Sequence, residues 1–280
     1  MRALVVGLVV APSFLVLLGC TPARRAALNP SSNGFVNNLT GWVYDTANRF
    51  VDGANVEILT GPYAGMQTTT NADGGFSFSG RFVDLVTIRA SRDGYRAQTQ
   101  TLNLPVGSGA PGRYLSFILP SLVDPTIVVG DFALTLKVDP ACTELPTGVR
   151  TRTYSIIASP MGSMTQAIAY VGGATMLDRF NRFIIAVSGD YVRFGFELIE
   201  QVADRTYLMI DGEAGTTVGS RTLNDLTTAF DGVVSYCVAK SELGSVFYAY
   251  CEPELNLVSR AECRSANHQV ILTRQERVPQ

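Results

Sequence analysis

The only histidine of the chain, His268, is the one side chain that could serve a serine or cysteine nucleophile as an ordinary general base. Such a base must itself be held in place by a third group, as in a catalytic triad. His268 alternates with the apolar residues Val270 and Leu272, so it shares their side of a predicted strand. The pattern predicts a structural histidine that faces the core or lies at the end of a barrel.

Two pairs of acidic residues have a spacing that acid–base chemistry on a glycosidic bond could use. The two carboxylates would have to lie within about 5 to 9.5 Å of each other. Acid pairs on exposed strands and turns are usually just solvated, and the sequence contains neither a Walker loop nor a GxSxG elbow. We therefore expect that the chain is not an enzyme. The pairs are Glu197 with Glu200 and Asp211 with Glu213.

Cysteines supply the remaining reactive side chains. Apart from Cys20, which ends an apolar N-terminal run, there are four, and an even number in an exported chain predicts two disulfides. Four cysteines allow three pairings, and we favour Cys251 with Cys263 and Cys142 with Cys237. A zinc site is the competing use of these residues, but the sequence has no CxxC pair and a single histidine. We expect no metal and no cofactor.

The N-terminal segment has the three parts of a secretory signal, namely Arg2, an apolar run that starts at Ala3, and the small residue Gly19. Followed by Cys20, it resembles the lipobox of bacterial lipoproteins. The resemblance implies a lipoprotein signal peptide over residues 1–19 and a lipid on Cys20. The alternative is an ordinary signal peptide or a short membrane anchor, although the run is shorter than the roughly 20 residues of a spanning helix.

A lipid on Cys20 would attach the mature chain to a membrane without spanning it, because two acyl chains already anchor a protein stably. Thr21 follows the cysteine, whereas aspartate there is the usual signal for retention in the inner membrane. We therefore expect an outer-membrane lipoprotein of the bacterial cell envelope. Residues 20–38 carry no apolar period and predict a flexible, lipidated tether.

Residues 39–120 consist of short alternating runs divided by turn residues, a pattern typical of all-β domains. Four blocks stand out: LTGWVYD at 39–45, VDGANV at 51–56, TNADGGFSF at 70–78 and ASRDGY at 90–95. In order and spacing they resemble the carboxypeptidase regulatory-like domain. The resemblance implies a seven-stranded transthyretin-like β-sandwich with no catalytic residue of its own. A related superfamily of this fold carries a carbohydrate-binding label.

The first block places two aromatic residues on one side of its strand. If Leu39 and Val43 face the core, alternation sends Trp42 and Tyr44 to the opposite face, about 6.6 Å apart. That spacing suits stacking on neighbouring sugar rings. The alternative is that both rings pack against the tether or the second domain, because large exposed apolar patches usually mark a contact surface.

The second half of the chain has longer strands. After a linker at residues 121–130, alternation such as Phe132, Leu134 and Leu136 recurs over residues 131–275 and predicts about 8 to 10 antiparallel strands, with a tail at 276–280. We favour a closed β-barrel over a second sandwich. The motifs CTELP, RTRTY and the closing 263–274 block resemble a C-terminal domain of exported lipoproteins, which implies a fold unit but no chemistry.

Composition excludes one class of partner. The net charge is −2, and no cluster of Lys and Arg exceeds a pair, so nucleic acid is not an expected partner. The sequence therefore predicts a non-catalytic, lipid-anchored binding module of the cell envelope, with carbohydrate as the expected ligand at Trp42 and Tyr44. A structural or assembly protein that binds other envelope proteins is the alternative, and a binder of small apolar ligands in the barrel is the third hypothesis.

Overall fold

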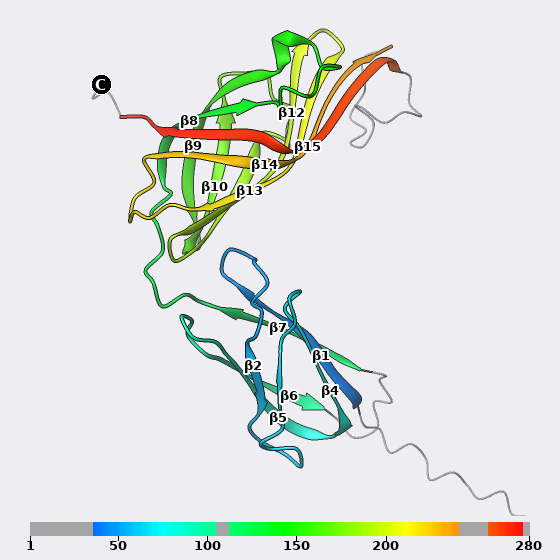
Figure 1. Ribbon diagram of the computed structural model, residues 1–280, viewed down its shortest axis with the longest axis vertical. Coiled ribbons are helices and arrows are strands. Elements are labelled where there is room, and N and C mark those ends of the chain that lie inside the picture. Colours follow the sequence, from blue (N-terminus) through cyan, green and yellow to red (C-terminus); the bar gives the residue numbers. More distant parts are fainter. Residues whose placement is uncertain (1–35, 105–111, 241–256, 277–280) are drawn as a thin grey trace, which may run out of the picture.

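A computed structural model of the chain describes residues 36–104, 112–240 and 257–276. In these ranges the chain forms two units built from strands, joined by a short segment (Figure 1). The predicted all-β class is therefore confirmed. The predicted signal peptide, Cys20, most of the predicted tether and Cys251 lie outside the described residues. In the described part of the chain, no helix has the length and apolar character that crossing a membrane requires.

The first unit is a sandwich of two sheets, as expected. One sheet has the order β4-β1-β7 and the other β3-β2-β5-β6. Strands β1 and β7 run parallel, and the other neighbours run antiparallel. The strands are β1 (Val36–Asp45), β2 (Asn55–Ile58), β3 (Gln67–Thr69), β4 (Gly75–Phe82), β5 (Asp84–Ser91), β6 (Gln98–Leu104) and β7 (Arg113–Leu119).

The sandwich core follows from the alternation of each strand. On β4, Phe76 and Phe78 are buried and contact each other, while the serines between and after them face solvent. Gly41 explains how β1 fits between its two neighbours. A Cβ atom on this residue would lie 2.1 Å from the Leu115 carbonyl oxygen of β7 and 2.9 Å from the Phe76 ring. Only glycine allows this close approach.

The second unit is a closed barrel, with the order β10-β11-β12-β13-β14-β15-β8-β9. Each strand pairs antiparallel with the next along the chain, and β15 returns to β8. The sequence-based preference for a barrel over a second sandwich is confirmed. The strands are β8 (Gly130–Lys137), β9 (Thr151–Met161), β10 (Ser163–Gly172), β11 (Arg182–Ser188), β12 (Tyr191–Ala203), β13 (Thr206–Thr217), β14 (Asp225–Ala239) and β15 (Leu257–Arg274); a 3-10 turn, Thr147–Val149, precedes β9.

Aromatic side chains fill the barrel interior. The Phe196 ring lies 4.7 Å from that of Phe183 and 5.5 Å from that of Phe230, between centroids. A cavity of about 10 Å³, lined in part by Leu136, Phe230 and His268, is one remaining space inside, and it has roughly the room of one water molecule. An eight-stranded barrel is just wide enough to be filled in this way. Side chains therefore occupy most of the described interior around this cavity.

The two units touch where the end of β1 meets the turn between β11 and β12. The Thr46 hydroxyl donates to the Val187 carbonyl oxygen at 2.6 Å, and the Arg49 guanidinium lies 3.8 Å from the centroid of the Tyr191 ring. The predicted linker is itself hydrogen-bonded to the barrel, because the Thr126 amide donates to the Gly189 carbonyl oxygen at 2.8 Å. The two units are therefore in direct contact, and the joining segment is fixed to the barrel.

Candidate functional site

Strand β1 presents Trp42 and Tyr44 on its outer side, as the alternation predicted. Leu39 and Val43 are fully buried, whereas the Trp42 side chain is 39% exposed and Tyr44 is half-buried. Both outward residues lie on the β4-β1-β7 sheet, on the side away from the sandwich core. The sequence-based assignment of the two faces of β1 is therefore correct.

Each of these rings has an aromatic partner from another part of the chain. Tyr114 of β7 stacks on Trp42, with ring centroids 6.0 Å apart and planes 9° apart. Phe50, which follows β1, contacts Tyr44 at 5.2 Å between centroids. Sequence reasoning missed Tyr114 because the parallel pairing of β7 with β1 is not local. The alternation Tyr114, Ser116, Ile118 is the signal that could have found it.

Together these side chains form an exposed surface that we call the aromatic face. Tyr114 is 75% exposed, Ile118 54% and Phe50 51%. Four of its five residues lie on the regular strands β1 and β7, which fix side chains more firmly than a loop would, and Phe50 lies in the segment after β1. The aromatic face consists of Trp42, Tyr44, Phe50, Tyr114 and Ile118.

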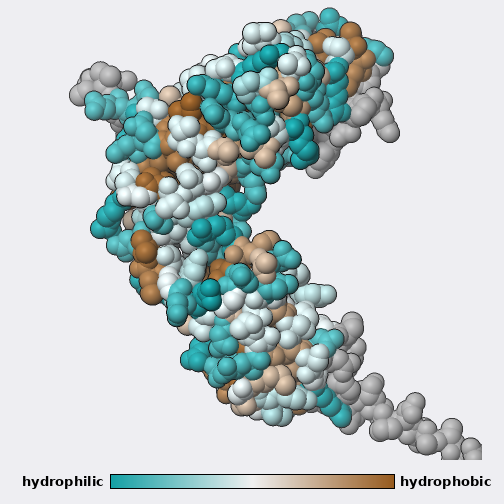
Figure 2. Space-filling model, in the orientation of Figure 1, coloured by the Kyte–Doolittle hydropathy of each residue, from teal (hydrophilic) through white to brown (hydrophobic). Residues whose placement is uncertain are grey.

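Small hydroxyl side chains surround the aromatic face. Ser77 and Ser79 of β4 and Ser116 of β7 are exposed on the same outer side of the sheet. Serine side chains are short, so they do not block access to the aromatic rings beside them. Figure 2 shows apolar patches on both units with hydrophilic side chains between them. A flat aromatic area next to hydroxyl groups can stack on a ring and hydrogen-bond to its edge.

A buried carboxylate shapes the turn at the upper end of the aromatic face. Asp45 is fully buried and accepts hydrogen bonds from the backbone amides of Ala47 at 2.8 Å and Arg49 at 3.0 Å. The Arg49 guanidinium also donates to Asp45 at 2.8 Å. This network fixes the turn that leads into Phe50, and it holds the Arg49 side chain against the barrel residue Tyr191.

The first predicted acid pair is divided between the two faces of β12. Glu197 is exposed, whereas Glu200 is 3% exposed and points into the barrel. There Glu200 accepts hydrogen bonds from Arg152, at 2.9 Å from the guanidinium Nε, and from the Tyr154 hydroxyl, at 2.9 Å. Burial raises the pKa of Tyr154, and the Glu200 carboxylate raises it further. The three side chains are hydrogen-bonded to one another through Glu200, an arrangement typical of a structural network.

The second predicted acid pair lies on the outside of the barrel. Asp211 and Glu213 are exposed on the same face of β13, two residues apart. Glu213 forms an ion pair with Arg193 of the neighbouring strand β12. The pair thus lies on a solvated surface, where nothing holds the two carboxylates in a fixed position relative to a substrate.

His268 lies inside the barrel, as its alternation predicted, and is 1% exposed. Its Nδ1 accepts a hydrogen bond from the backbone amide of Asp139 at 2.9 Å. Burial lowers the pKa of His268, while the carboxylates of Asp139 and Asp231 partly oppose that shift. The side chain therefore anchors the chain that follows β8 to strand β15 by accepting from its backbone.

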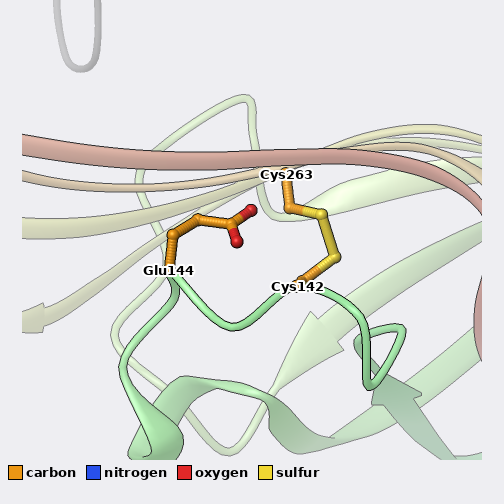
Figure 3. Close-up of side chains that lie close together, drawn as sticks. All are labelled: Cys142, Glu144 and Cys263. Carbon is orange, nitrogen blue, oxygen red and sulfur yellow. A yellow bond between two sulfur atoms is a disulfide. The ribbon is translucent and has the colours of Figure 1, made fainter.

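A disulfide joins Cys142 to Cys263, which corrects the pairing that the sequence favoured. Figure 3 shows it linking the loop of Cys142 and Glu144 to β15. Sequence proximity suggested Cys251 for Cys263, but barrel closure places β15 beside β8 and therefore beside the loop after β8. Cys237, buried on β14, is also disulfide-bonded.

The same place holds a group of potential metal ligands. One ligand atom each of Cys142, Glu144 and Cys263 lie within 4.8 Å of one another. Metal binding by cysteine needs a thiolate, and here both sulfur atoms are joined in the disulfide. The group is therefore a covalent link with an exposed carboxylate beside it.

Comparisons with known proteins place the aromatic face in a family context. Residues 38–117 match the family model of the carboxypeptidase regulatory-like domain, in agreement with the resemblance of the four sequence blocks. No curated protein matches the chain. Among solved structures, the chain aligns with fervidolysin from Fervidobacterium pennivorans, a keratinolytic enzyme related to subtilisin, at 10% identity and a TM-score of 0.25. The alignment covers 86% of this chain and 31% of that enzyme.

Proposed function

We propose that this chain is a non-catalytic binding module of the bacterial cell envelope, which is anchored by a lipid on Cys20 and binds polysaccharide through the aromatic face. The observation that carries the proposal is the exposed stack of Trp42 and Tyr114 on the outer side of a rigid sheet. A monomeric protein rarely leaves such large rings grouped in solvent unless they contact something.

Polysaccharide is the ligand whose surface complements this face. A sugar ring has an apolar face of C–H groups and a rim of hydroxyls. Stacking needs a flat aromatic side chain, which Trp42 and Tyr114 provide, and the rim needs hydrogen-bonding groups, which Ser77 and Ser116 provide. The described acidic pairs and His268 are held in structural contacts or dispersed on the surface, so they do not favour a catalytic role.

The first test compares glycan binding by single variants of the aromatic face. Trp42→Ala and Tyr114→Ala are each expected to weaken binding to a retained polysaccharide by about tenfold or more, because truncating a central aromatic anchor commonly costs about 2 kcal/mol and about 1.4 kcal/mol corresponds to tenfold. Retention on an array of bacterial and plant polysaccharides, followed by titration calorimetry, measures the loss. Tyr170→Ala is the matched control, because Tyr170 is 44% exposed on the barrel. Unchanged retention in both face variants would remove the proposal's main support.

The second test addresses the lipid. Cys20→Ser is expected to release the protein from the membrane fraction and to abolish incorporation of a fatty-acid label. The disulfides give an independent check. Cys237 is disulfide-bonded, and once Cys142 is paired with Cys263 only Cys20 and Cys251 remain in the sequence. A lipid on Cys20 therefore predicts that peptide mapping links Cys237 to Cys251, and a link from Cys237 to Cys20 contradicts the anchor.

A protein-binding role remains the second candidate because the barrel has its own exposed apolar surface. Ile157 of β9 lies opposite Tyr170 of β10. Ile184 of β11 pairs with Ile168, two residues before Tyr170 on β10. Ile157 is 56% exposed and Ile184 37%. Crosslinking in intact cells separates the candidates, because a recurring protein partner that is lost in Ile157→Asp, without glycan retention by the wild-type chain, favours envelope assembly.

A further inference from the structure

A cleft lies between the sandwich and the barrel, with a volume of about 360 Å³. Its walls come from both units and from the segment that joins them. Arg96 and Gln98 belong to the sandwich, Pro120 and Asp124 to the joining segment, and Thr165 to the barrel strand β10. The volume falls in the range of ordinary ligand sites, which is about 300 to 1,000 Å³.

The register of β1 and β7 leads directly from the aromatic face to this cleft. Tyr44 and Ile118 are paired on the outer side of the sheet, and the next pair, Asp45 with Leu119, is buried. The following residues, Thr46 and Pro120, both line the cleft. From Tyr114 to Pro120 the strand advances six residues, or about 20 Å. The aromatic face and the cleft are therefore consecutive parts of one surface.

The cleft adds longer polar side chains to the small hydroxyl groups beside the aromatic face. Gln98 supplies an amide, Thr165 a hydroxyl and Arg96 a guanidinium. Arg96 is exposed and has no ion-pair partner among the residues that the structure describes, whereas the Asp124 carboxylate pairs with Arg221 at 2.7 Å. These groups can donate to sugar hydroxyls, while Pro120 supplies an apolar wall.

We propose that the aromatic face and the cleft form one continuous track for a single polysaccharide chain, to which both units contribute. The inference rests on the proposed function and adds two statements to it. The ligand is a glycan of several units that runs along β7 into the cleft, and the barrel takes part in binding through Thr165. A monosaccharide or disaccharide covers only part of the track.

The test uses the Cys20→Ser chain and an array that presents each polysaccharide beside its own disaccharide and octasaccharide. For a glycan that is retained, the octasaccharide is expected to bind at least about tenfold more tightly than the disaccharide. The double variant Arg96→Ala, Gln98→Ala is expected to weaken octasaccharide binding by about tenfold and to leave the disaccharide unchanged, since each lost hydrogen bond costs a several-fold factor. Thr99→Ala is the matched control. Thr99 follows Gln98 on β6, is exposed, and points to the opposite face of the strand.

The outcomes separate the two proposals. Equal affinities for disaccharide and octasaccharide, or an unaffected octasaccharide in the double variant, overturn the continuous track while loss of binding in Trp42→Ala still supports the aromatic face. Absence of binding to every glycan by a folded, disulfide-bonded chain overturns both. A length preference that is lost in the double variant and retained in Thr99→Ala supports the track.

Discussion

Replacing Glu200 by alanine is expected to lower the free energy of unfolding by about 3 kcal/mol. The change leaves the Arg152 guanidinium and the Tyr154 hydroxyl inside the barrel without their acceptor. Breaking a buried ion pair by removing one partner costs about 3 to 5 kcal/mol, and the lower end applies because the Arg152 side chain is 31% exposed. Urea unfolding followed by circular dichroism measures the loss.

Two further variants make this result decisive. Glu197→Ala lies three residues earlier on the same strand but faces solvent, so its free energy of unfolding should change by less than about 0.5 kcal/mol. The triple variant Arg152→Met, Tyr154→Phe, Glu200→Leu removes all three polar partners together, and it should recover part of the stability. If Glu200→Ala is as stable as the wild type, the cluster is not the structural network described above.

Removing the Cys142–Cys263 disulfide with a double alanine variant is expected to cost about 2 to 5 kcal/mol of unfolding free energy. The link spans 121 residues of sequence, so it limits the unfolded chain over almost the whole barrel. It also ties the loop after β8 to β15, next to the seam where the last strand closes on the first. Urea unfolding of the oxidised proteins provides the comparison.

The control for the disulfide is Thr143→Ala, an exposed neighbour of Cys142 in the same loop, which should leave stability unchanged. A double alanine variant with the unfolding midpoint of the wild type would contradict the expected role. Glycan retention provides a second measurement. The disulfide lies in the barrel, away from the aromatic face of the sandwich, so a folded double variant should keep wild-type binding to that face.

Alternation predicted which face of its own strand a side chain occupies. It could not predict which side chains of distant strands become neighbours. The outward position of Trp42 and Tyr44 and the inward position of His268 follow from a period of two, which any strand imposes. Tyr114 could not be placed beside Trp42 without knowing that β7 pairs with β1 in parallel. Parallel neighbours need a long connection, and its length gives no information on register.

The predicted disulfide pairing and the predicted exposure of Glu200 were wrong for a related reason. Cys142 meets Cys263 only because the barrel closes between its first and last strands. The sequence favoured a closed barrel, but it did not indicate which residues of those two strands pair. Glu200 read as a surface acid because its partners, Arg152 and Tyr154, lie on a strand far earlier in the chain. A buried charge becomes visible in a sequence only when its counter-charge is local.

The parallel pairing of β1 with β7 also has a mechanical consequence. The chain enters the sandwich at the first residue of β1 and leaves it towards the barrel at the last residue of β7, and these points lie at opposite ends of the paired strands. A pull on the barrel against an anchored N-terminus would load the two strands in shear, so that the ladder from Leu39 and Arg113 to Asp45 and Leu119 resists as a whole. An antiparallel pair pulled at adjacent ends would instead open one hydrogen bond at a time. For the proposed polysaccharide-binding role, a pull between the bound glycan's module and its N-terminus would thus load the sheet that carries the aromatic face along the direction in which its hydrogen bonds resist together.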